Sequence, residues 1–528
     1  MFVPLSVLEF RDRAELFFKD KIGVIDGDKR FTYEQFAERT HRLANALRDL
    51  GVQPGDRISF MTYNTHQLLE AYYGVLEAGA VLNPINVRLN ATDIAYILDH
   101  SASRVLFYHK DFTPLVAAFK PQLQETKQFV VMEGDLVAPA THEYEGLLAG
   151  ASPEYNAPEI DENAIAELFY TSGTTGRPKG VALTHRNLHL HALYTTMALQ
   201  FDDTARILHI VPLFHVNGWG TPHTVTLQGG THVMLRKVDP TMMLSLIEKE
   251  RITHVLGVPF IFNALVNHPE LGKYDLSSIK RLMTGGAPAS PTLIKAMQEK
   301  LGGLATVGYG LSETTPVICL ATPRVHLSAR ETLEQKMARQ ATTGWAIPGS
   351  TLRVVDSHDR DVPADGEHIG EIVVRSNVVM LGYYKDPQAT AAAIRDGWFH
   401  TGDMATIDGE GYILIKDRSK DIIISGGENI SSVEIENALY THPAVFECAV
   451  VAAPDEKWGE VPVAVVSLKP GAQATADELM ACAREKLPVF MVPKRIEFRD
   501  QLPKGGTGKI LKAEIRQPYW VGRDKHVN

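Results

Sequence analysis

Cysteine is scarce in this chain of 528 residues, which contains only Cys319, Cys448 and Cys482. The three lie far apart and form no Cys-x-x-Cys pair. A disulfide framework or a structural zinc site is therefore not expected, and the composition favours a reducing compartment. An excess of basic residues is also missing, because the formal net charge is −10. That charge argues against a nucleic-acid partner but leaves room for a local basic pocket.

The chain has no uninterrupted apolar segment suited to a membrane-spanning helix. Its longest stretch without Lys, Arg, Asp or Glu, Ile207–Leu235, is interrupted by Pro212, Pro222 and several glycines. The N-terminal segment has no basic region before its apolar residues and already contains Glu9, so it does not form a usual signal peptide. We therefore expect a cytoplasmic protein without an integral membrane segment, although a lipid-like substrate could bring it to a membrane.

Strand-like and helix-like segments alternate through most of the chain, which predicts an α/β fold. Arg57–Tyr63 has the composition of a strand and is followed by a helical pattern over Gln67–Ala78. Such alternation predicts parallel sheets with crossover helices in a large N-terminal domain. Short alternating runs over 351–416 predict a small β-rich subdomain, and the residues beyond Arg418 predict an α+β domain. Residues 324–342 are polar and indicate an irregular, exposed excursion.

A loop rich in hydroxyl groups and glycine follows the predicted strand Ala166–Tyr170, and a helix over His185–Leu199 is expected to leave it. The loop contains Thr171, Ser172, Gly173, Thr174, Thr175, Gly176 and Lys179. Glycines let backbone N–H groups turn toward a ligand, while the lysine adds a positive charge. These features favour a polyphosphate site at the carboxyl end of a strand. A polar surface loop explains the same residues equally well, because the spacing is not that of the common P-loop.

Several later stretches share the glycine-rich, polar character of this loop: Thr284–Pro288, Gly308–Thr314, Thr401–Asp403, Ser425–Asn429 and Pro503–Lys509. In this order and at these separations, the set resembles the adenylate-forming superfamily, and most closely its fatty acyl-CoA synthetases. The resemblance covers nearly the whole chain. It implies an N-terminal domain over residues 1–419 and a mobile C-terminal domain over residues 420–528, with a hinge at Lys420.

The resemblance also implies a two-step reaction that uses ATP, Mg²⁺ and coenzyme A. Thr171–Lys179 would hold the β- and γ-phosphates, and Thr174 and Glu313 would lie beside the metal. Lys509 would stabilise charge on the acid carboxylate and the α-phosphate during adenylation. The remaining nucleotide-binding positions that it implies are Gly286, Ala287, Pro288, Gly308, Tyr309, Gly310, Ser312, Asp403 and Arg418.

Each of these side chains also has a purely structural interpretation. Tyr309 would stack on adenine, yet a lone tyrosine at a strand end more often belongs to the core. Asp403 would accept from the ribose hydroxyls, yet aspartate is common in tight turns after glycine. Arg418 would contact ribose or phosphate, or else form a surface ion pair. Glu313 could instead be a carboxylate near a helix N-terminus.

The acid and the thiol are expected to bind at two further places. An uncharged stretch with His215 and Trp219 would line the acid pocket together with Gly286 and Gly310, and Trp219 resembles the gate residue of fatty acyl-CoA synthetases. His215 also fits a buried, hydrogen-bonded histidine. The positions implied for coenzyme A are Ser425, Gly426, Gly427, Glu428 and Trp458, of which Trp458 fits a partly buried surface anchor equally well.

We therefore expect an ATP-dependent, AMP-forming acid–CoA ligase for a medium- or long-chain fatty acid, with a homodimer as a possible assembly. A ligase for a short, branched, thioether-containing or aromatic acid remains open. An adenylation module serving a carrier protein is disfavoured, because no carrier domain follows Lys509. Lys509, Glu313 and Asp403 also argue against a nucleotide-binding protein without turnover.

Three histidines, His185, His189 and His191, lie in the helix expected after the glycine-rich loop. They lack a carboxylate partner at the spacing of a metal site, so we expect a solvated helix face there.

Overall fold

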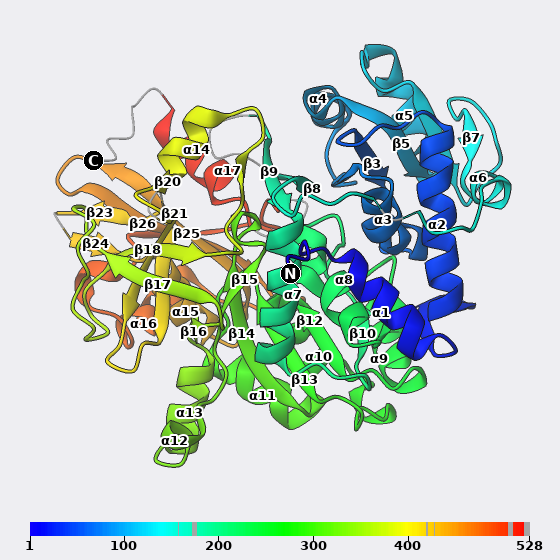
Figure 1. Ribbon diagram of the computed structural model, residues 1–528. Helices are drawn as coiled ribbons and strands as arrows, with labels where there is room; N and C mark the ends of the chain where they lie inside the picture. The colour runs from blue at the N-terminus through cyan, green and yellow to red at the C-terminus, as the bar shows by residue number, and fades with distance from the viewer. Residues whose placement is uncertain (157, 172–176, 419–420, 427, 505–509, 522–528) are drawn as a thin grey trace. The chain divides into compact units, whose positions relative to one another are not determined.

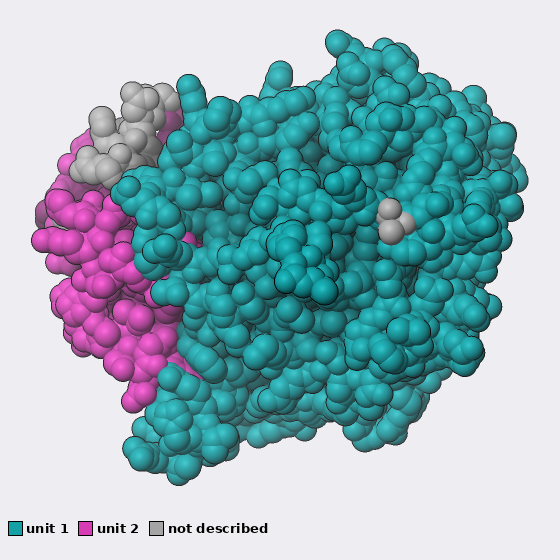
Figure 2. Space-filling view, viewed as in Figure 1, with its two compact units in different colours: residues 1–351, 375–399 teal, residues 352–374, 400–528 magenta. Residues whose placement is uncertain are grey.

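The computed structural model describes residues 1–156, 158–171, 177–418, 421–426, 428–504 and 510–521 (Figure 1). The chain divides into two compact units, which Figure 2 colours separately. Unit 1 comprises residues 1–351 and 375–399, and unit 2 comprises residues 352–374 and 400–528. The expected hinge at Lys420 and the boundary at 419/420 lie outside the described residues, so both remain predictions.

A nine-stranded sheet forms the larger layer of unit 1. Its strands β14, β13, β12, β10, β11 and β1 run parallel, and antiparallel strands complete both edges. In spatial order the strands are β16 (Trp345–Ala346), β15 (Val317–Leu320), β14 (Leu304–Gly310), β13 (Arg281–Gly285), β12 (His254–Gly257), β10 (Arg206–His209), β11 (Thr231–Met234), β1 (Ile22–Asp26) and β2 (Lys29–Thr32).

The second sheet of unit 1 has eight strands. Its parallel part runs from β8 to β7, while β9 pairs antiparallel with both β8 and β19. In spatial order the strands are β19 (Gly382–Tyr383), β9 (Lys179–Thr184), β8 (Ile165–Thr171), β4 (Val81–Pro84), β3 (Arg57–Met61), β5 (Ser103–His109), β6 (Gln128–Met132) and β7 (His142–Glu143).

Helices of unit 1 follow the strands as crossover connections, which confirms the predicted α/β class. Several begin at the expected polar caps: the Thr184 side chain accepts from the backbone N–H of Asn187 at the start of α7, and Ser290 caps α11. The helices are α1 (Leu8–Phe18), α2 (Tyr33–Asp49), α3 (His66–Glu77), α4 (Ala91–Ser101), α5 (Thr113–Phe119), α6 (Tyr144–Gly150), α7 (His185–Leu199), α8 (Val216–Leu227), α9 (Pro240–Lys249), α10 (Pro259–Val266), α11 (Pro291–Leu301), α12 (Val325–Ser328), α13 (Leu333–Gln340) and α14 (Pro387–Ala393).

The segment 324–342 is not the irregular excursion that its polarity suggests. It contains α12 and α13, and α13 begins with a capping box between Thr332 and Gln335. Met337 and Gln340 of α13 are buried, and Met337 belongs to the core of the nine-stranded sheet. A short helix with one buried stripe looks polar on average, because most of its residues face solvent.

Two smaller sheets make up the β-rich C-terminal part of the chain. One contains β17 (Ser350–Val355), β18 (Gly370–Ser376), β21 (Trp398–Ile407), β20 (Ile394–Arg395) and β22 (Ile413–Arg418), and unit boundaries fall within β17, β18 and β21. The other contains β24 (Glu428–Ile430), β23 (Ile423–Ser425), β26 (Gly459–Leu468), β25 (Val445–Asp455) and β27 (Arg495–Phe498). Helices α15 (Ser432–Tyr440), α16 (Ala476–Arg484) and α17 (Lys512–Arg516) complete unit 2.

No helix in the described ranges combines the length and apolar character that crossing a bilayer requires.

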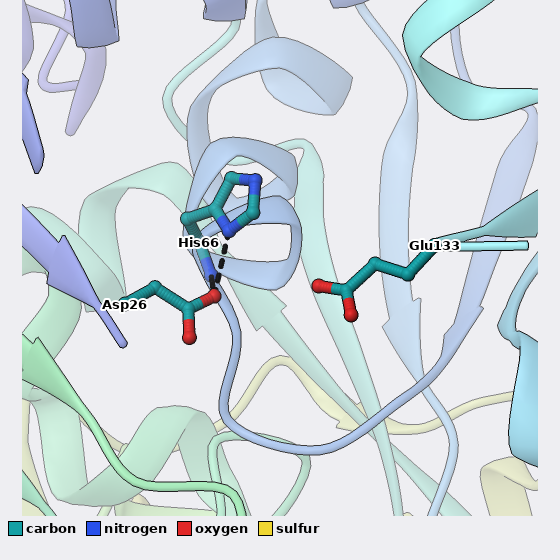
Figure 3. A group of neighbouring side chains, drawn as sticks. All are labelled: Asp26, His66 and Glu133. Carbon is teal, nitrogen blue, oxygen red and sulfur yellow. Dashed lines mark hydrogen bonds and ion pairs between the residues drawn. The ribbon is translucent and has the colours of Figure 1, made fainter. Parts of the chain in front are cut away.

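A network of charged side chains joins the two sheets of unit 1, and Figure 3 shows three of its members, Asp26, His66 and Glu133. Asp26, at the end of β1, accepts from the backbone N–H of His66 at 3.1 Å and lies 2.6 Å from its Nδ1. Glu133, directly after β6, receives two hydrogen bonds of 2.6 Å from the guanidinium of Arg236. The same guanidinium lies 3.4 Å from Asp26. The network therefore connects β1 and Arg236, two residues beyond the end of β11, with α3 and the residue after β6.

Asp26, His66 and Glu133 are also the one described group of His, Cys, Asp and Glu side chains that could hold a metal ion, with ligand atoms within 4.8 Å of one another. A cation would have to displace Arg236, which already bonds to both carboxylates. Arg236 lowers the pKa of Glu133 to about 2, although burial alone would raise it. We therefore interpret the group as a charge-compensated network that joins sheets.

The network should make stability depend on pH through His66. Burial lowers the pKa of His66, but the hydrogen bond with Asp26 and the nearby Glu145 and Glu70 carboxylates raise it more, so the net shift is upward. A raised folded-state pKa contributes stability that is complete below the unfolded value of about 6.5 and is lost as pH rises through the folded pKa. We expect His66→Gln to lower the thermal unfolding midpoint more at about pH 6 than at about pH 9.

The matched control is His368→Gln. His368 also pairs with an aspartate, Asp365, at 2.6 Å, but its side chain is 61% exposed, so little stability should depend on it at either pH. A difference between wild type and His66→Gln that grows with pH would contradict the proposed protonation of His66.

Candidate active site

The neighbouring strands β13 and β14 end at the same edge of the nine-stranded sheet. They run parallel, and Gly285 pairs with Gly308 in register. This pairing places the exposed residues Gly286, Ala287 and Pro288 beside Tyr309 and Gly310. The carboxyl edge of parallel strands is where α/β sheets bind ligands. The two predicted adenine-binding stretches, Gly286–Pro288 and Gly308–Gly310, are thus brought together.

Glycine is required at this edge by the close approach of backbones. A Cβ added at Gly285 would lie 2.6 Å from the carbonyl oxygen of Gly308, and one at Gly310 would lie 1.5 Å from that of Pro316. Neither backbone can move without breaking the ladder of β13, β14 and β15. The glycines therefore let the strand ends pack closely, with the Tyr309 side chain between Gly308 and Gly310, which suits a surface on which a planar base could lie.

Glu313 lies directly beyond this edge, in the 3₁₀ turn η4 (Ser312–Thr314). Its carboxylate Oε1 accepts a hydrogen bond of 2.9 Å from the hydroxyl of Tyr383, and its carbonyl accepts one of 2.8 Å from the N–H of Met380. The side chain is half-buried, and no cation pairs with it in the described part of the chain. A carboxylate oriented in this way fits the oxygen ligand that Mg²⁺ prefers.

Lys179 approaches the same tyrosine from the neighbouring strand, because it begins β9, which pairs with β19, the strand of Tyr383, in the eight-stranded sheet. Its Nζ lies 5.0 Å from the centre of the Tyr383 ring, within the range of a cation–π contact. Tyr383 therefore bridges the lysine of the proposed phosphate loop and the proposed metal carboxylate. We did not single out Tyr383 from the sequence. The only signal was its place in the segment Met380–Tyr384, which follows the glutamate motif and precedes Thr401–Asp403.

The glycine-rich loop joins two antiparallel strands, which corrects our expectation that a helix leaves it. Thr171, the last residue of β8, pairs with Lys179, the first residue of β9, and α7 begins only after β9. The carboxyl end of β8 still carries the loop, as predicted. Ser172, Gly173, Thr174, Thr175 and Gly176 lie outside the described residues, so their roles remain predictions.

The proposed acid-binding stretch adopts an unusual backbone conformation at the start of α8. Val216, Asn217, Gly218, Trp219 and Gly220 all have positive φ, from 39° to 82°. We call residues 216–220 the acid turn. Left-handed conformations cost non-glycine residues roughly 1–2 kcal/mol each and concentrate at functional sites. His215 precedes the turn and is half-buried, and its N–H donates to the carbonyl of Pro212 at 2.9 Å.

The acid turn directs the indole of Trp219 onto the glycine edge. A Cβ built on Gly285 would lie 3.4 Å from Trp219 Cη2, and one built on Gly286 would lie 3.8 Å from Cζ2. Trp219 also packs on a buried apolar cluster that includes Val211 and Met283. Trp219 and Gly286, two of the residues expected to line the acid pocket, are therefore neighbours in the structure, and their contact with an acid remains a prediction.

The three histidines of α7 are buried, so our expectation of a solvated helix face was wrong. His185, His189 and His191 are 6%, 4% and 1% exposed. Burial lowers the pKa of His191 to about 3, and its Nε2 accepts from the N–H of Val317 at 3.2 Å. Polar side chains can face a core when they find partners there, which spacing alone does not reveal.

The predicted ribose residues belong to unit 2. Asp403 on β21 pairs with Arg418 on β22 across an antiparallel ladder, and Arg418 Nε lies 2.7 Å from Asp403 Oδ1. The structure thus brings these two positions together as an ion pair with a buried carboxylate. Their contact with ribose remains a prediction.

Four residues predicted to bind coenzyme A also meet within unit 2. Ser425 pairs with Glu428 across the β23–β24 hairpin, and the N–H of Gly426 donates to the carbonyl of Trp458 at 2.8 Å. A Cβ on Gly426 would lie 2.7 Å from the indole of Trp458, which is 44% exposed. Gly427 and the proposed catalytic Lys509 lie outside the described residues.

Comparisons with known proteins identify the family. The model of the AMP-binding enzyme matches residues 10–384, and that of the AMP-binding enzyme C-terminal domain matches residues 434–509. The acetate/butyrate–CoA ligase of Arabidopsis thaliana peroxisomes is 39% identical over 98% of this chain and 94% of its own. A long-chain-fatty-acid–CoA ligase of Thermus thermophilus is also 39% identical, over 98% and 96%.

Among solved structures, an anthranilate CoA ligase in complex with anthranoyl-AMP superimposes with a TM-score of 0.91 at 26% identity, covering 99% of this chain and 98% of that one. The prediction of an AMP-forming acid–CoA ligase is thereby confirmed at the level of the reaction class. This chain belongs to the AMP-binding enzyme family.

Proposed function

We propose that the protein uses ATP and Mg²⁺ to join a medium- or long-chain fatty acid to coenzyme A through an acyl-adenylate. The observation that carries the proposal is the common edge of β13 and β14, where Tyr309 and the flat glycine surface lie next to Glu313. Such an edge offers a nucleotide one stacking face and one metal-binding carboxylate. The uncharged acid turn beside it offers an apolar wall.

The first step needs charge neutralisation more than covalent chemistry. The acid carboxylate attacks the α-phosphorus of ATP, the bond to the β-phosphate breaks, and pyrophosphate leaves. Glu313 and Thr174 would hold Mg²⁺, which supplies positive charge to the phosphates. Lys179 would contact the leaving phosphates, while Lys509 would stabilise the reacting carboxylate and the α-phosphate oxygen.

The second step transfers the acyl group to a thiol. The sulfur of coenzyme A attacks the acyl carbonyl, and AMP leaves as the thioester forms. We propose that the C-terminal domain turns about Lys420 between the two steps, so that Lys509 withdraws and Gly426–Glu428 approaches. The meeting of Ser425, Gly426, Glu428 and Trp458 supports one shared contact surface for this purpose. A cytoplasmic location and a homodimer also remain predictions.

A short or branched acid is the second candidate substrate. The observation that favours it is the indole of Trp219, which lies against Gly285 and Gly286 and would shorten an acid pocket formed at this edge. The relatives act on acids of both kinds according to their names, acetate or butyrate in one and long-chain fatty acids in another.

A panel of acids separates these candidates. The protein is incubated with ATP, Mg²⁺ and straight acids from two to sixteen carbons, with branched and aromatic acids, and AMP, pyrophosphate and thioester are measured with and without coenzyme A. We expect AMP and thioester in equal amounts, with the highest kcat/KM for a medium or long acid. If kcat/KM were highest for acetate or butyrate, the substrate would be a short acid, the second candidate. Absence of AMP with every acid would refute the ligase.

Lys509 should matter for one half-reaction only. We expect Lys509→Ala to lower pyrophosphate formation by at least ~10²-fold, as loss of a transition-state charge contact does. Conversion of a supplied acyl-adenylate to thioester should stay near the wild-type rate. The control is Lys504→Ala, which removes a nearby lysine that pairs with Glu447 and should spare both steps. Equal losses in both half-reactions would contradict the proposed role of Lys509.

Tyr383 should affect the metal requirement. Tyr383→Phe removes the hydroxyl that donates to Glu313 at 2.9 Å, a bond to a charged group worth about 1.5–3 kcal/mol. We expect the Mg²⁺ concentration for half-maximal pyrophosphate formation to rise by roughly 10-fold, with the KM for the acid little changed. Tyr384→Phe is the matched control, since its ring packs near His100. If both variants behaved alike, Tyr383 would have no special role at Glu313.

A further inference from the structure

A buried carboxylate lies behind the acid turn, and the ligase chemistry does not use it. Glu167 is in the middle of β8 and has no exposed surface. Its Oε2 accepts a hydrogen bond of 3.0 Å from the side-chain amide of Asn217, and its Oε1 lies 2.7 Å from Nε2 of His223. Both oxygens therefore engage residues of α8, one within the acid turn and one a turn of helix beyond it.

Asn217 transmits this contact through the backbone of the turn. While its amide nitrogen donates to Glu167, its Oδ1 accepts from the N–H of Gly220 at 2.7 Å. Asn217 itself has a φ of 39°, and Trp219 has a φ of 64°. Backbone strain of this kind persists only when the surroundings hold it in place. The Glu167–Asn217–Gly220 chain of hydrogen bonds spans the strained residues and supplies that support.

The opposite side of the turn is held by packing. A Cβ added to Gly220 would lie 2.5 Å from Cε1 of His191, so the imidazole touches the backbone there. His191 is itself held by the N–H of Val317, next to the glycine edge. His223 is held between Tyr72 and Tyr73, with ring centres 5.6 Å and 5.7 Å away. The acid turn is therefore held by the hydrogen bond of Asn217 to Glu167 and by the packing of His191 against Gly220. These contacts fix the direction of the Trp219 side chain.

We propose that Glu167 is a positioning residue that sets how far Trp219 closes the acid pocket, and thereby which acyl tail lengths the enzyme accepts. The inference rests on the proposed function for its substrate. It adds a residue that touches neither acid nor nucleotide and acts through Asn217 and His223. Glu167 lies on the strand that leads into the phosphate loop, so the same strand carries the loop at its end and controls the acid pocket from its middle.

The first test is Glu167→Gln. Asn217 donates to the carboxylate of Glu167, and so does His223 when its proton is on Nε2. Glutamine keeps the shape of the side chain but offers one acceptor oxygen and one NH₂ group. One of the two donors would then face another donor. We expect the ratio of kcat/KM between the longest and the shortest accepted acid to change by roughly 10-fold through the KM of the acid, as loss of a hydrogen bond to a buried charge does. The KM for ATP should change less than the KM for the acid, because Glu313 is held by Tyr383 and Met380 and not by Glu167 or Asn217.

Three further variants make the result specific. Asn83→Ser alters an equally buried polar residue on the adjacent strand β4 and controls for loss of stability alone. Asn217→Gly removes the amide without strain, because glycine accepts a positive φ, and it serves if Glu167→Gln does not fold. In a Trp219→Ala background, Glu167→Gln should no longer change the selectivity, since the two residues act through one path.

A readout independent of turnover is the fluorescence of Trp219, taken as the difference between each protein and its Trp219→Phe counterpart. We expect Glu167→Gln and Asn217→Gly to shift its emission, while Asn83→Ser leaves it unchanged. Unchanged selectivity and emission would overturn the inference, as would a uniform loss of activity with all acids that Asn83→Ser reproduces. If wild type formed no AMP with any acid, the proposed function would fail, and the emission shift would still decide whether Glu167 positions the turn.

Discussion

The close approach of two glycine backbones, Gly285 and Gly308, is the constraint on which the active edge depends. No side chain fits between β13 and β14 where these strands end. The absence of side chains leaves a flat surface, with Tyr309 on one side and the indole of Trp219 lying against the other. Glu313 and Tyr383 then occupy the next turn of chain. A larger residue at Gly285 would press on the backbone of Gly308, whereas one at Gly308 would press on the side chain of Met283.

Buried charges explain how the surrounding segments hold their places. An unpaired carboxylate inside a protein is costly, so each one must find donors, and the donors here come from distant parts of the chain. Asp26 bonds to His66, as Figure 3 shows, and Arg236 bonds to both Asp26 and Glu133, which joins the two sheets of unit 1. Glu167 meets Asn217 and His223, which joins β8 to the acid turn. In both cases the hydrogen bonds that a carboxylate requires hold the backbone of another segment in place.

Much of the architecture could be predicted from the sequence, since apolar periodicity and polar caps are local properties. The strand Arg57–Met61 and the helix α7 lie close to where these patterns place them. The errors share one cause. His191 looked solvated by spacing but is buried against Gly220, and β9 was missed because a short strand after a glycine loop has no distinct local pattern. Glu167 gave no signal and Tyr383 gave only its place between two motifs, because their importance lies in partners that are distant in sequence.

The sequence by itself indicated the family and the reaction class, because its glycine- and hydroxyl-rich stretches resemble those of the adenylate-forming superfamily in order and separation. It also determined which residues are candidates for the acid, among them His215 and Trp219. Only the tertiary structure determined the direction in which the Trp219 side chain points, toward Gly285 and Gly286. Its direction depends on a left-handed turn held by Glu167 from one side and His191 from the other. Such a conformation is unfavourable locally, so no local pattern can encode it, and it exists only where contacts from other strands and helices enforce it.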